Sequence, residues 1–200
     1  MPELKLDVAG ADGTSEGFLY TPAGDGPWPG ILYLTDIWGI RPANQAMAQR
    51  VAEQGYAVLA IDQSQVGLAK AAAWAAERGV RLPAQCADLA DYQVTPGHWD
   101  AIVSIWCHLP DGLRRDVHRR CVRGLAPGGV IILEAYTPEQ LRHRTGGPTS
   151  LDLLPTLALL REDFQGLQIL HGEECERHVA EGSRHLGLSA VVQVVAQRAV

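Results

Sequence analysis

The 200-residue sequence has no apolar run that approaches the roughly 20 residues of a membrane span. Residues 1–6 carry charges where a secretion signal would be apolar, so secretion is not expected. Acidic residues outnumber basic ones by 23 to 17, and the net charge of −6 argues against nucleic acid as the main partner. The composition predicts a cytoplasmic protein with no membrane or nucleic-acid partner, and it is compatible with a small-molecule partner.

Cysteine is also scarce. Four cysteines without paired spacing are interpreted as free thiols in a reducing compartment: Cys86, Cys107, Cys121 and Cys175. His118 with Cys121, and Cys175 with His178, have the i,i+3 helical spacing that can hold a metal ion. Neither pair has two further ligands nearby in the sequence, so no metal site is predicted.

Apolar segments and turn-forming segments alternate along the chain without repeats, which predicts one domain over residues 1–200. Continuous apolar runs predict buried parallel strands at 30–35, 56–61, 101–106 and 130–133. We also expect a hairpin over 3–22, strands at 81–87, 168–171 and 190–196, and a polar ribbon at 173–187. Helices are predicted at 42–54, 64–78, 113–125 and 151–161, the last disturbed by Pro155, with a capping box at 137–140. This order indicates an α/β fold: a three-layer, Rossmann-like, doubly wound and mostly parallel sheet, with an N-terminal β-hairpin and an antiparallel C-terminal strand.

The C-terminal two-thirds, residues 56–200, carry short motifs in a fixed order. They are AIDQS at 60–64, ADL at 87–89, WDAIVS at 99–104, CHLP at 107–110, LAPGG at 125–129 and EAYT at 134–137. With these motifs the segment resembles class I S-adenosylmethionine-dependent methyltransferases, especially the tellurite-resistance type. The resemblance implies S-adenosylmethionine as the cofactor, if one binds.

Four residues of this segment are candidates for the site. Asp62 ends a predicted parallel strand, where ligands bind in such sheets, and the resemblance implies that it accepts hydrogen bonds from ribose hydroxyls. By the same resemblance, Asp88 would receive the adenine amino group, and Cys107 and His108 would lie at the methyl-acceptor site. Each has a simpler alternative: Asp62 before a helix N-terminus, Asp88 as a loop residue, and Cys107 and His108 as packing residues.

The first third lacks the glycine-rich loop that should follow the first strand of such a methyltransferase. Residues 35–44 read TDIWGIRPAN, with one glycine, a bulky Trp38 and a proline that removes an amide donor. With TPAG at 21–24 and WPGI at 28–31, the segment 1–59 instead resembles the N-terminus of dienelactone hydrolase-like α/β-hydrolases. In that family an amide near Ile37 would belong to the oxyanion hole. If S-adenosylmethionine binds, Asp36 and Gly39 of this loop would contact it.

The hydrolase nucleophile is missing from its expected context. The match to the pattern Gly-x-Ser-x-Gly is at 13–17, with Ser15 inside the predicted hairpin, whereas a nucleophile elbow lies between a strand and a helix. Our main interpretation is a recombined or engineered hybrid scaffold, joined within about 55–60, with no complete catalytic site and little or no activity. The alternatives are a methyltransferase with a degraded cofactor loop and, second, a hydrolase.

The two resemblances conflict at one edge of the sheet. In the hydrolases the N-terminal hairpin pairs beside the strand equivalent to 56–61, whereas in the methyltransferases the strand equivalent to 81–87 takes that edge. We predict that 81–87 keeps this place and that the hairpin packs elsewhere.

The helix predicted at 113–125 is rich in arginine. Because Leu113, Val117 and Cys121 form its apolar stripe, we expect the arginines on a solvated face. These residues are Arg114, Arg115, Arg119, Arg120 and Arg123.

Overall fold

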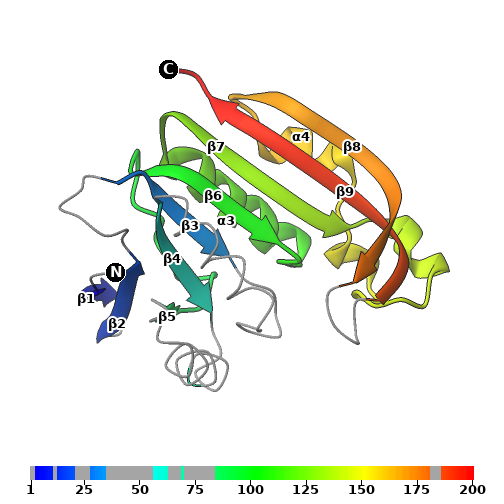
Figure 1. Ribbon diagram of the computed structural model, residues 1–200. Helices are drawn as coiled ribbons and strands as arrows, with labels where there is room; N and C mark the ends of the chain where they lie inside the picture. Colours follow the sequence, from blue (N-terminus) through cyan, green and yellow to red (C-terminus); the bar gives the residue numbers. More distant parts are fainter. Residues whose placement is uncertain are drawn as a thin grey trace.

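The chain forms one mixed β-sheet with helices packed against it (Figure 1). The computed structural model describes residues 3–10, 13–20, 28–34, 56–62, 69, 84–180 and 186–200. The strands are β1 (Glu3–Gly10), β2 (Gly13–Tyr20), β3 (Gly30–Leu34), β4 (Ala57–Asp62), β5 (Ala84–Cys86), β6 (Trp99–Ile105), β7 (Leu125–Tyr136), β8 (Leu167–Ala180) and β9 (Leu186–Arg198). The described helices are α3 (Asp111–Gly124) and α4 (Leu157–Asp163), with the 3-10 turns η1 (Pro138–Arg142) and η2 (Leu151–Leu153).

The sheet is parallel in its centre and antiparallel at both ends. Its strand order is β1-β2-β4-β3-β6-β7-β9-β8, and β5 also pairs with β4. The central strands β5, β4, β3, β6 and β7 run parallel, whereas β9 runs antiparallel to β7 and to β8. The apolar run of β3 is buried from Ile31 to Leu34, as expected for a strand covered on both faces. This confirms the predicted fold class, with its N-terminal hairpin and antiparallel C-terminal strand.

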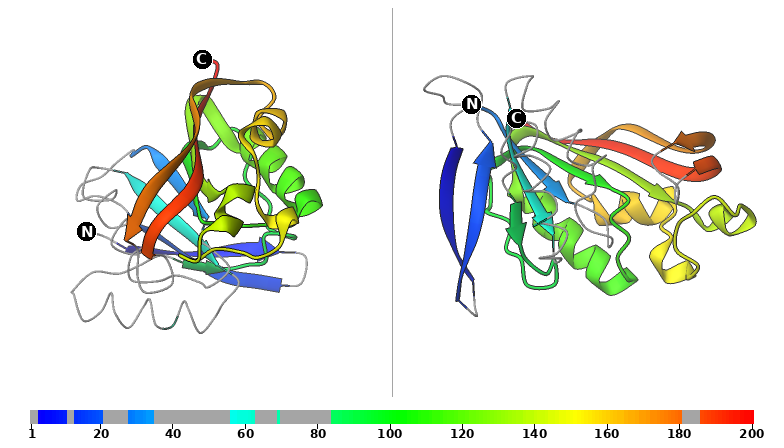
Figure 2. Two further views of the ribbon diagram at one scale, coloured as in Figure 1. Left: turned by 90° about the vertical axis from the view of Figure 1, so that its right-hand side faces the viewer. Right: turned by 60° about the horizontal axis from the view of Figure 1, so that its bottom comes forward.

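The helices α3 and α4 lie against the same face of the sheet (Figure 2). Val117 and Cys121 of α3 and Leu160 of α4 pack in one core with Ile102 and Ile131 of the strands. The four-residue spacing in α3 puts the two apolar side chains on one side of the helix, which faces the sheet. The helices predicted at 42–54 and 64–78 lie outside the described residues, apart from Ala69.

The N-terminal hairpin pairs with β4, so the prediction that it packs elsewhere is wrong. Tyr20 of β2 lies opposite Val58 in the first half of β4. The second half of the same edge pairs with β5, in the register Ala60 to Ala84 through Asp62 to Cys86. Because β5 has only three residues, it leaves the start of β4 open for the hairpin.

The C-terminal half differs from expectation in its helices. Pro155 leaves η2 and α4 as separate elements where one helix was predicted at 151–161, since proline has no amide to donate within a helix. Thr137 makes no side-chain cap, so the capping box predicted at 137–140 is also wrong. The ribbon predicted at 173–187 is confirmed in its described part, where it belongs to the long antiparallel pair β8–β9.

Candidate functional site

Four parallel strands end together at one edge of the sheet. Leu34 of β3 is in register with Ile61 of β4 and with Ser104 of β6, and Asp62 of β4 is in register with Cys86 of β5. The chain passes from β3 to β4 on one side and returns to β6 on the other, so the strand order reverses at β3. In open parallel sheets ligands bind outside the carboxyl ends at this switch point. The topology therefore makes this edge the candidate site.

The predicted cofactor residues lie at or beside this edge where the structure describes them. Asp62 is the last residue of β4, and Asp88 follows β5 by two residues. The exposed Asp88 carboxylate accepts a hydrogen bond from the Ala90 amide at 2.8 Å through Oδ1. This hydrogen bond gives Asp88 the loop role that is its simpler alternative, and it uses one of the two carboxylate oxygens. Asp36 and Gly39 lie outside the described residues.

The acceptor-site candidates follow β6 at the same edge. Trp106 has a φ of 59°, a left-handed conformation that is rare for a bulky residue and typical of functional sites. His108 is 6% exposed, and its Nδ1 lies 2.9 Å from the Leu153 carbonyl oxygen. Because a carbonyl only accepts, Nδ1 carries a proton in this contact. Cys107 is half-buried against the core.

An aromatic stack fixes the His108 ring. The His108 and Tyr136 rings are nearly parallel, with centroids 5.6 Å apart, and the Tyr136 ring stacks on Trp106 at 4.4 Å. Arg177 of β8 lies over the Trp106 ring, 5.9 Å from its centroid, and bonds Glu134 at 2.6 Å. Rings packed in this way have little freedom to change rotamer. The orientation of His108 is therefore set by β7 and β8 as well as by its own loop.

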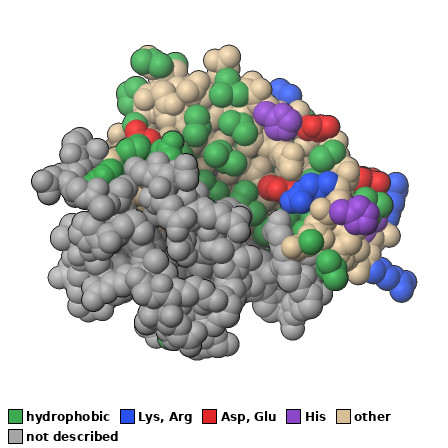
Figure 3. Space-filling view, in the orientation of Figure 1, with side chains coloured by type: hydrophobic (Ala, Val, Ile, Leu, Met, Phe, Trp, Pro, Cys, Tyr) green, Lys and Arg blue, Asp and Glu red, His purple; other side chains and the backbone are tan. Residues whose placement is uncertain are grey.

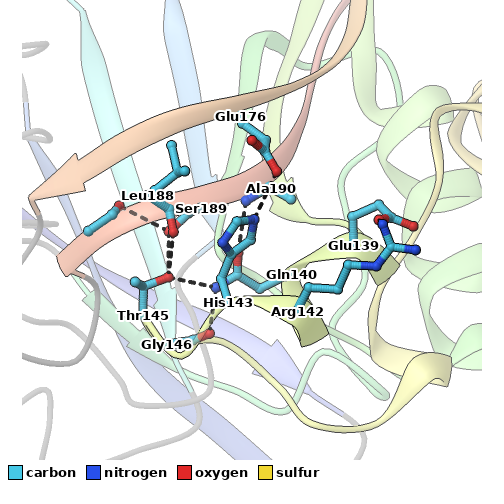
Figure 4. Close-up of polar contacts among 11 residues, drawn as sticks. Glu139, Gln140, Arg142, His143, Thr145, Gly146, Glu176, Leu188, Ser189 and Ala190 are labelled. Carbon is cyan, nitrogen blue, oxygen red and sulfur yellow. Dashed lines mark hydrogen bonds and ion pairs between the residues drawn. The ribbon is translucent and has the colours of Figure 1, made fainter.

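The segment after β7 is tied to the C-terminal strands by Gln140, which is 1% exposed (Figure 4). Its amide nitrogen donates to Thr145 Oγ1 at 3.0 Å and to the Gly146 carbonyl at 2.9 Å, and its oxygen accepts from the Ala190 amide at 2.8 Å. Thr145 Oγ1 in turn donates to the Leu188 carbonyl at 2.8 Å. Residues 140–146 are thereby held against the start of β9.

Two polar side-chain pairs also fasten this end of β8. His143 Nε2 lies 2.9 Å from Glu176 Oε1, and Arg177 pairs with Glu134. On the face in Figure 3, charged and histidine side chains gather toward one end, with opposite signs next to each other. The sequence predicted neither these pairs nor the contact of Gln140 with Ala190, because each joins residues far apart in the chain.

A buried ion cluster joins α3 to α4. Asp163 Oδ2 accepts from Arg114 Nε at 2.7 Å and from His118 Nδ1 at 2.8 Å, and all three side chains are buried. Burial lowers the pKa of His118 and outweighs the opposing effect of Asp163. For Asp163, burial acts to raise the pKa, but the hydrogen bonds from His118 and Arg114 lower it overall. With its pKa lowered, His118 donates from Nδ1 to the Asp163 carboxylate as a neutral ring.

The structure corrects the expectation for two of the five arginines of α3. Arg114 and Arg120 are buried, so the solvated face expected for all five arginines is wrong for these two. The signal was present in the spacing, since Arg114 lies three residues before Val117 and Arg120 three residues after it, beside the apolar stripe. The outer arginines Arg115, Arg119 and Arg123 line an open cleft of about 430 Å³ with Glu162 and Gln165.

The described residues contain no group of three or more side chains that could hold a metal ion. His118 is committed to Asp163, and Cys121 is buried in the core. Cys175 and His178 lie on β8, so their three-residue spacing is not helical. No helix in the described part of the chain is long and apolar enough to cross a membrane.

The hydrolase-type motif has no catalytic context. Ser15 lies within β2 and is paired with Val8 of β1, so it is not at a turn between a strand and a helix. This confirms the expected placement of the motif in the hairpin.

Comparison with known proteins points to one family over the middle of the chain. A family model described as a methyltransferase domain matches residues 44–129. This match starts inside the segment 1–59 that was assigned to the hydrolases, so the methyltransferase-like region reaches further upstream than the predicted boundary at 55–60. The likeness of the residues before 44 to hydrolases stays a prediction.

Two curated relatives and several solved structures are similar. N-terminal Xaa-Pro-Lys N-methyltransferase 1 of Mus musculus is 36% identical over 77 residues, which are 37% of this chain and 34% of that protein. The Rattus norvegicus protein of the same name is 35% identical over the same length. The chain thus spans about a third of the length of these curated relatives.

Among solved structures, a methyltransferase from Methanosarcina mazei has a TM-score of 0.64 at 15% identity, with 88% of this chain and 95% of that chain covered. The N-methyltransferase NodS from Bradyrhizobium japonicum has a TM-score of 0.63 at 13% identity, with 88% of each chain covered. TehB from Haemophilus influenzae has a TM-score of 0.63 at 15% identity and covers 85% of this chain and 58% of its own. The chain therefore has the Rossmann-like fold of class I methyltransferases, and its residues 44–129 match a methyltransferase domain.

Proposed function

We propose that this chain is an S-adenosylmethionine-dependent methyltransferase that binds its cofactor at the carboxyl edge of β3, β4, β5 and β6. The observation that carries the proposal is the switch point at β3, with Asp62 ending the neighbouring strand β4. The match of residues 44–129 to a methyltransferase domain supports it, since this range includes β4, β5 and β6.

The residues at this edge fit a nucleoside in their chemistry. A carboxylate at Asp62 can accept hydrogen bonds from two ribose hydroxyls. Asp88 has one carboxylate oxygen that is not used by the Ala90 amide, and that oxygen can accept from an exocyclic amino group. The loop with Asp36 and Gly39 follows β3 in the chain and would complete the site. When bound, the cofactor supplies an electrophilic methyl group.

The acceptor side is formed by the segment that follows β6. We propose that Cys107 and His108 form the acceptor side, with the buried His108 ring held by the Leu153 carbonyl and the Tyr136 ring so that it keeps this segment in place. A nitrogen acceptor is the class favoured by the curated relatives, which are named as N-methyltransferases. Cys107 would lie beside the acceptor in the same loop. The main contribution of the chain would be alignment of the two reactants.

Calorimetric titration with S-adenosylmethionine tests the proposal. We expect binding in the micromolar range for the wild type, loss of that binding in Asp62→Asn, and unchanged binding in the exposed control Glu139→Gln. A wild type that gives no heat at millimolar ligand would contradict the proposal.

A second candidate is the inert hybrid scaffold. One observation favours it: β4 carries on one edge both the hairpin expected from the hydrolase resemblance and the strand β5 expected from the methyltransferase resemblance. The same titration separates the two candidates, because an inert scaffold binds neither S-adenosylmethionine nor its demethylated product.

A further inference from the structure

Arg120 is a buried cation in the middle of α3. It is 5% exposed, whereas the side chain of its neighbour Arg119 on the same helix is 67% exposed. Its guanidinium donates through Nη1 to the Tyr92 carbonyl and through Nη2 to the Leu89 carbonyl, the latter at 2.7 Å. Nη2 also lies 2.9 Å from Asp116 Oδ2. Arg120 therefore joins α3 to the segment that follows β5.

The two carbonyls belong to the turn that carries Asp88. The Asp88 carbonyl accepts from the amides of Asp91 at 3.0 Å and Tyr92 at 2.8 Å, which closes the turn. Burial raises the pKa of Tyr92 to about 12, so its phenol stays neutral in the core. A planar guanidinium can donate to two backbone carbonyls at once in fixed geometry.

We propose that Arg120 is a positioning residue for the cofactor site, holding the turn 88–92 so that Asp88 faces the nucleoside base. This rests on the proposed function, because it takes Asp88 as the residue that recognises the exocyclic amino group. Lysine cannot replace Arg120 here, because an ammonium lacks the fixed fork that reaches both carbonyls.

The structural half of the proposal is tested without any ligand. Amide hydrogen exchange is measured at Asp91 and Tyr92 in the wild type, in Arg120→Lys and in the matched control Arg119→Lys. We expect exchange about tenfold faster in Arg120→Lys, as for loss of one hydrogen bond to a charged group, and no change in the control. Equal rates in Arg120→Lys and the wild type would overturn the proposal.

The functional half is tested by ligand discrimination. Calorimetry compares S-adenosylhomocysteine with S-inosylhomocysteine, which lacks the amino group. We expect the wild type to prefer the adenosyl ligand by about tenfold, the size of one charge-assisted hydrogen bond. This preference should fall toward one in Arg120→Lys and in Asp88→Asn, and it should persist in Arg119→Lys and Asp91→Asn. General damage to the fold would weaken the binding of both ligands equally and leave the ratio of their affinities unchanged. An unchanged ratio in Arg120→Lys would therefore refute a positioning role.

Two further results keep the outcomes distinct. If Arg120→Lys does not fold, Asp116→Asn removes the carboxylate that orients the guanidinium, and we expect a smaller change in the same direction for exchange and for ligand preference. No change in Asp116→Asn would then count against the proposal. If the wild type binds neither ligand, the proposed function and the positioning role both fail, whereas the exchange rates still decide whether Arg120 holds the turn.

Discussion

Replacing Asp163 with asparagine is expected to destabilise the protein through the contact between α3 and α4. The Asp163 carboxylate is buried and accepts from Arg114 at 2.7 Å and from His118 at 2.8 Å. Removing one partner of a buried ion cluster costs about 3–5 kcal/mol, because the remaining charge stays buried without its counter-charge. Asparagine keeps one acceptor oxygen, and Asp111 still pairs with Arg114 at 2.8 Å. We therefore expect the lower end, about 3 kcal/mol of unfolding free energy.

The assay is urea unfolding followed by circular dichroism, with thermal unfolding as a second measure. For a domain of this size, about 3 kcal/mol corresponds to a fall in Tm of about 6–12 °C. The matched control is Glu139→Gln, the same carboxyl-to-amide change in the exposed pair with Arg142, where we expect less than about 0.5 kcal/mol. If Asp163→Asn unfolds within about 1 kcal/mol of the wild type, the cluster does not hold the two helices together as described.

Three further predictions concern other contacts. The stability of the wild type should fall as the pH drops below about 6.5, the usual pKa of histidine. Burial lowers the pKa of His118 in the folded protein, so below this pH the unfolded chain binds one more proton than the fold does. Urea midpoints across this pH range measure the fall, which should be smaller in His118→Gln. Gln140→Leu should cost about 3 kcal/mol, since the Ala190 amide and the Thr145 and Gly146 oxygens lose a buried partner; a melting temperature equal to that of Glu139→Gln would contradict this. Gly147→Ala and Gly166→Ala both place alanine at φ 92°, but only Gly147→Ala brings a Cβ atom to 2.7 Å from the Tyr136 ring. Gly147→Ala should therefore cost about 1–3 kcal/mol more stability than Gly166→Ala and alter the near-ultraviolet circular dichroism of the aromatic stack. Equal costs would mean that the Tyr136 ring moves aside without loss of stability.

Much of the fold could be predicted from local sequence patterns. The apolar runs at 30–35 and 101–106 became β3 and β6, because a strand buried on both faces must be apolar throughout. The pairing of the hairpin with β4 could not be predicted from the two family resemblances, because each resemblance assigns the whole edge to one strand. The outcome depends on the short length of β5, which ends before it covers the start of β4.

The candidate site was predictable only in part. Asp88 and His108 could be placed because strand ends in a parallel sheet meet at one edge. The partners of Arg120 and Gln140 could not be predicted, because they lie far away in the chain and a polar side chain without known partners is expected in water. Arg120 meets carbonyls 28 and 31 residues away, and Gln140 meets the amide of Ala190 from 50 residues away.

The central claim is that a nucleoside binds at the carboxyl edge of β3 to β6, and mapping hydrogen exchange with and without S-adenosylhomocysteine tests it most directly. We predict slower exchange on ligand addition in the segment 35–44, at the end of β4 and in the turn 88–92, with no change in β8 and β9. Unchanged exchange throughout at millimolar ligand, or protection confined to β8 and β9, would contradict the claim.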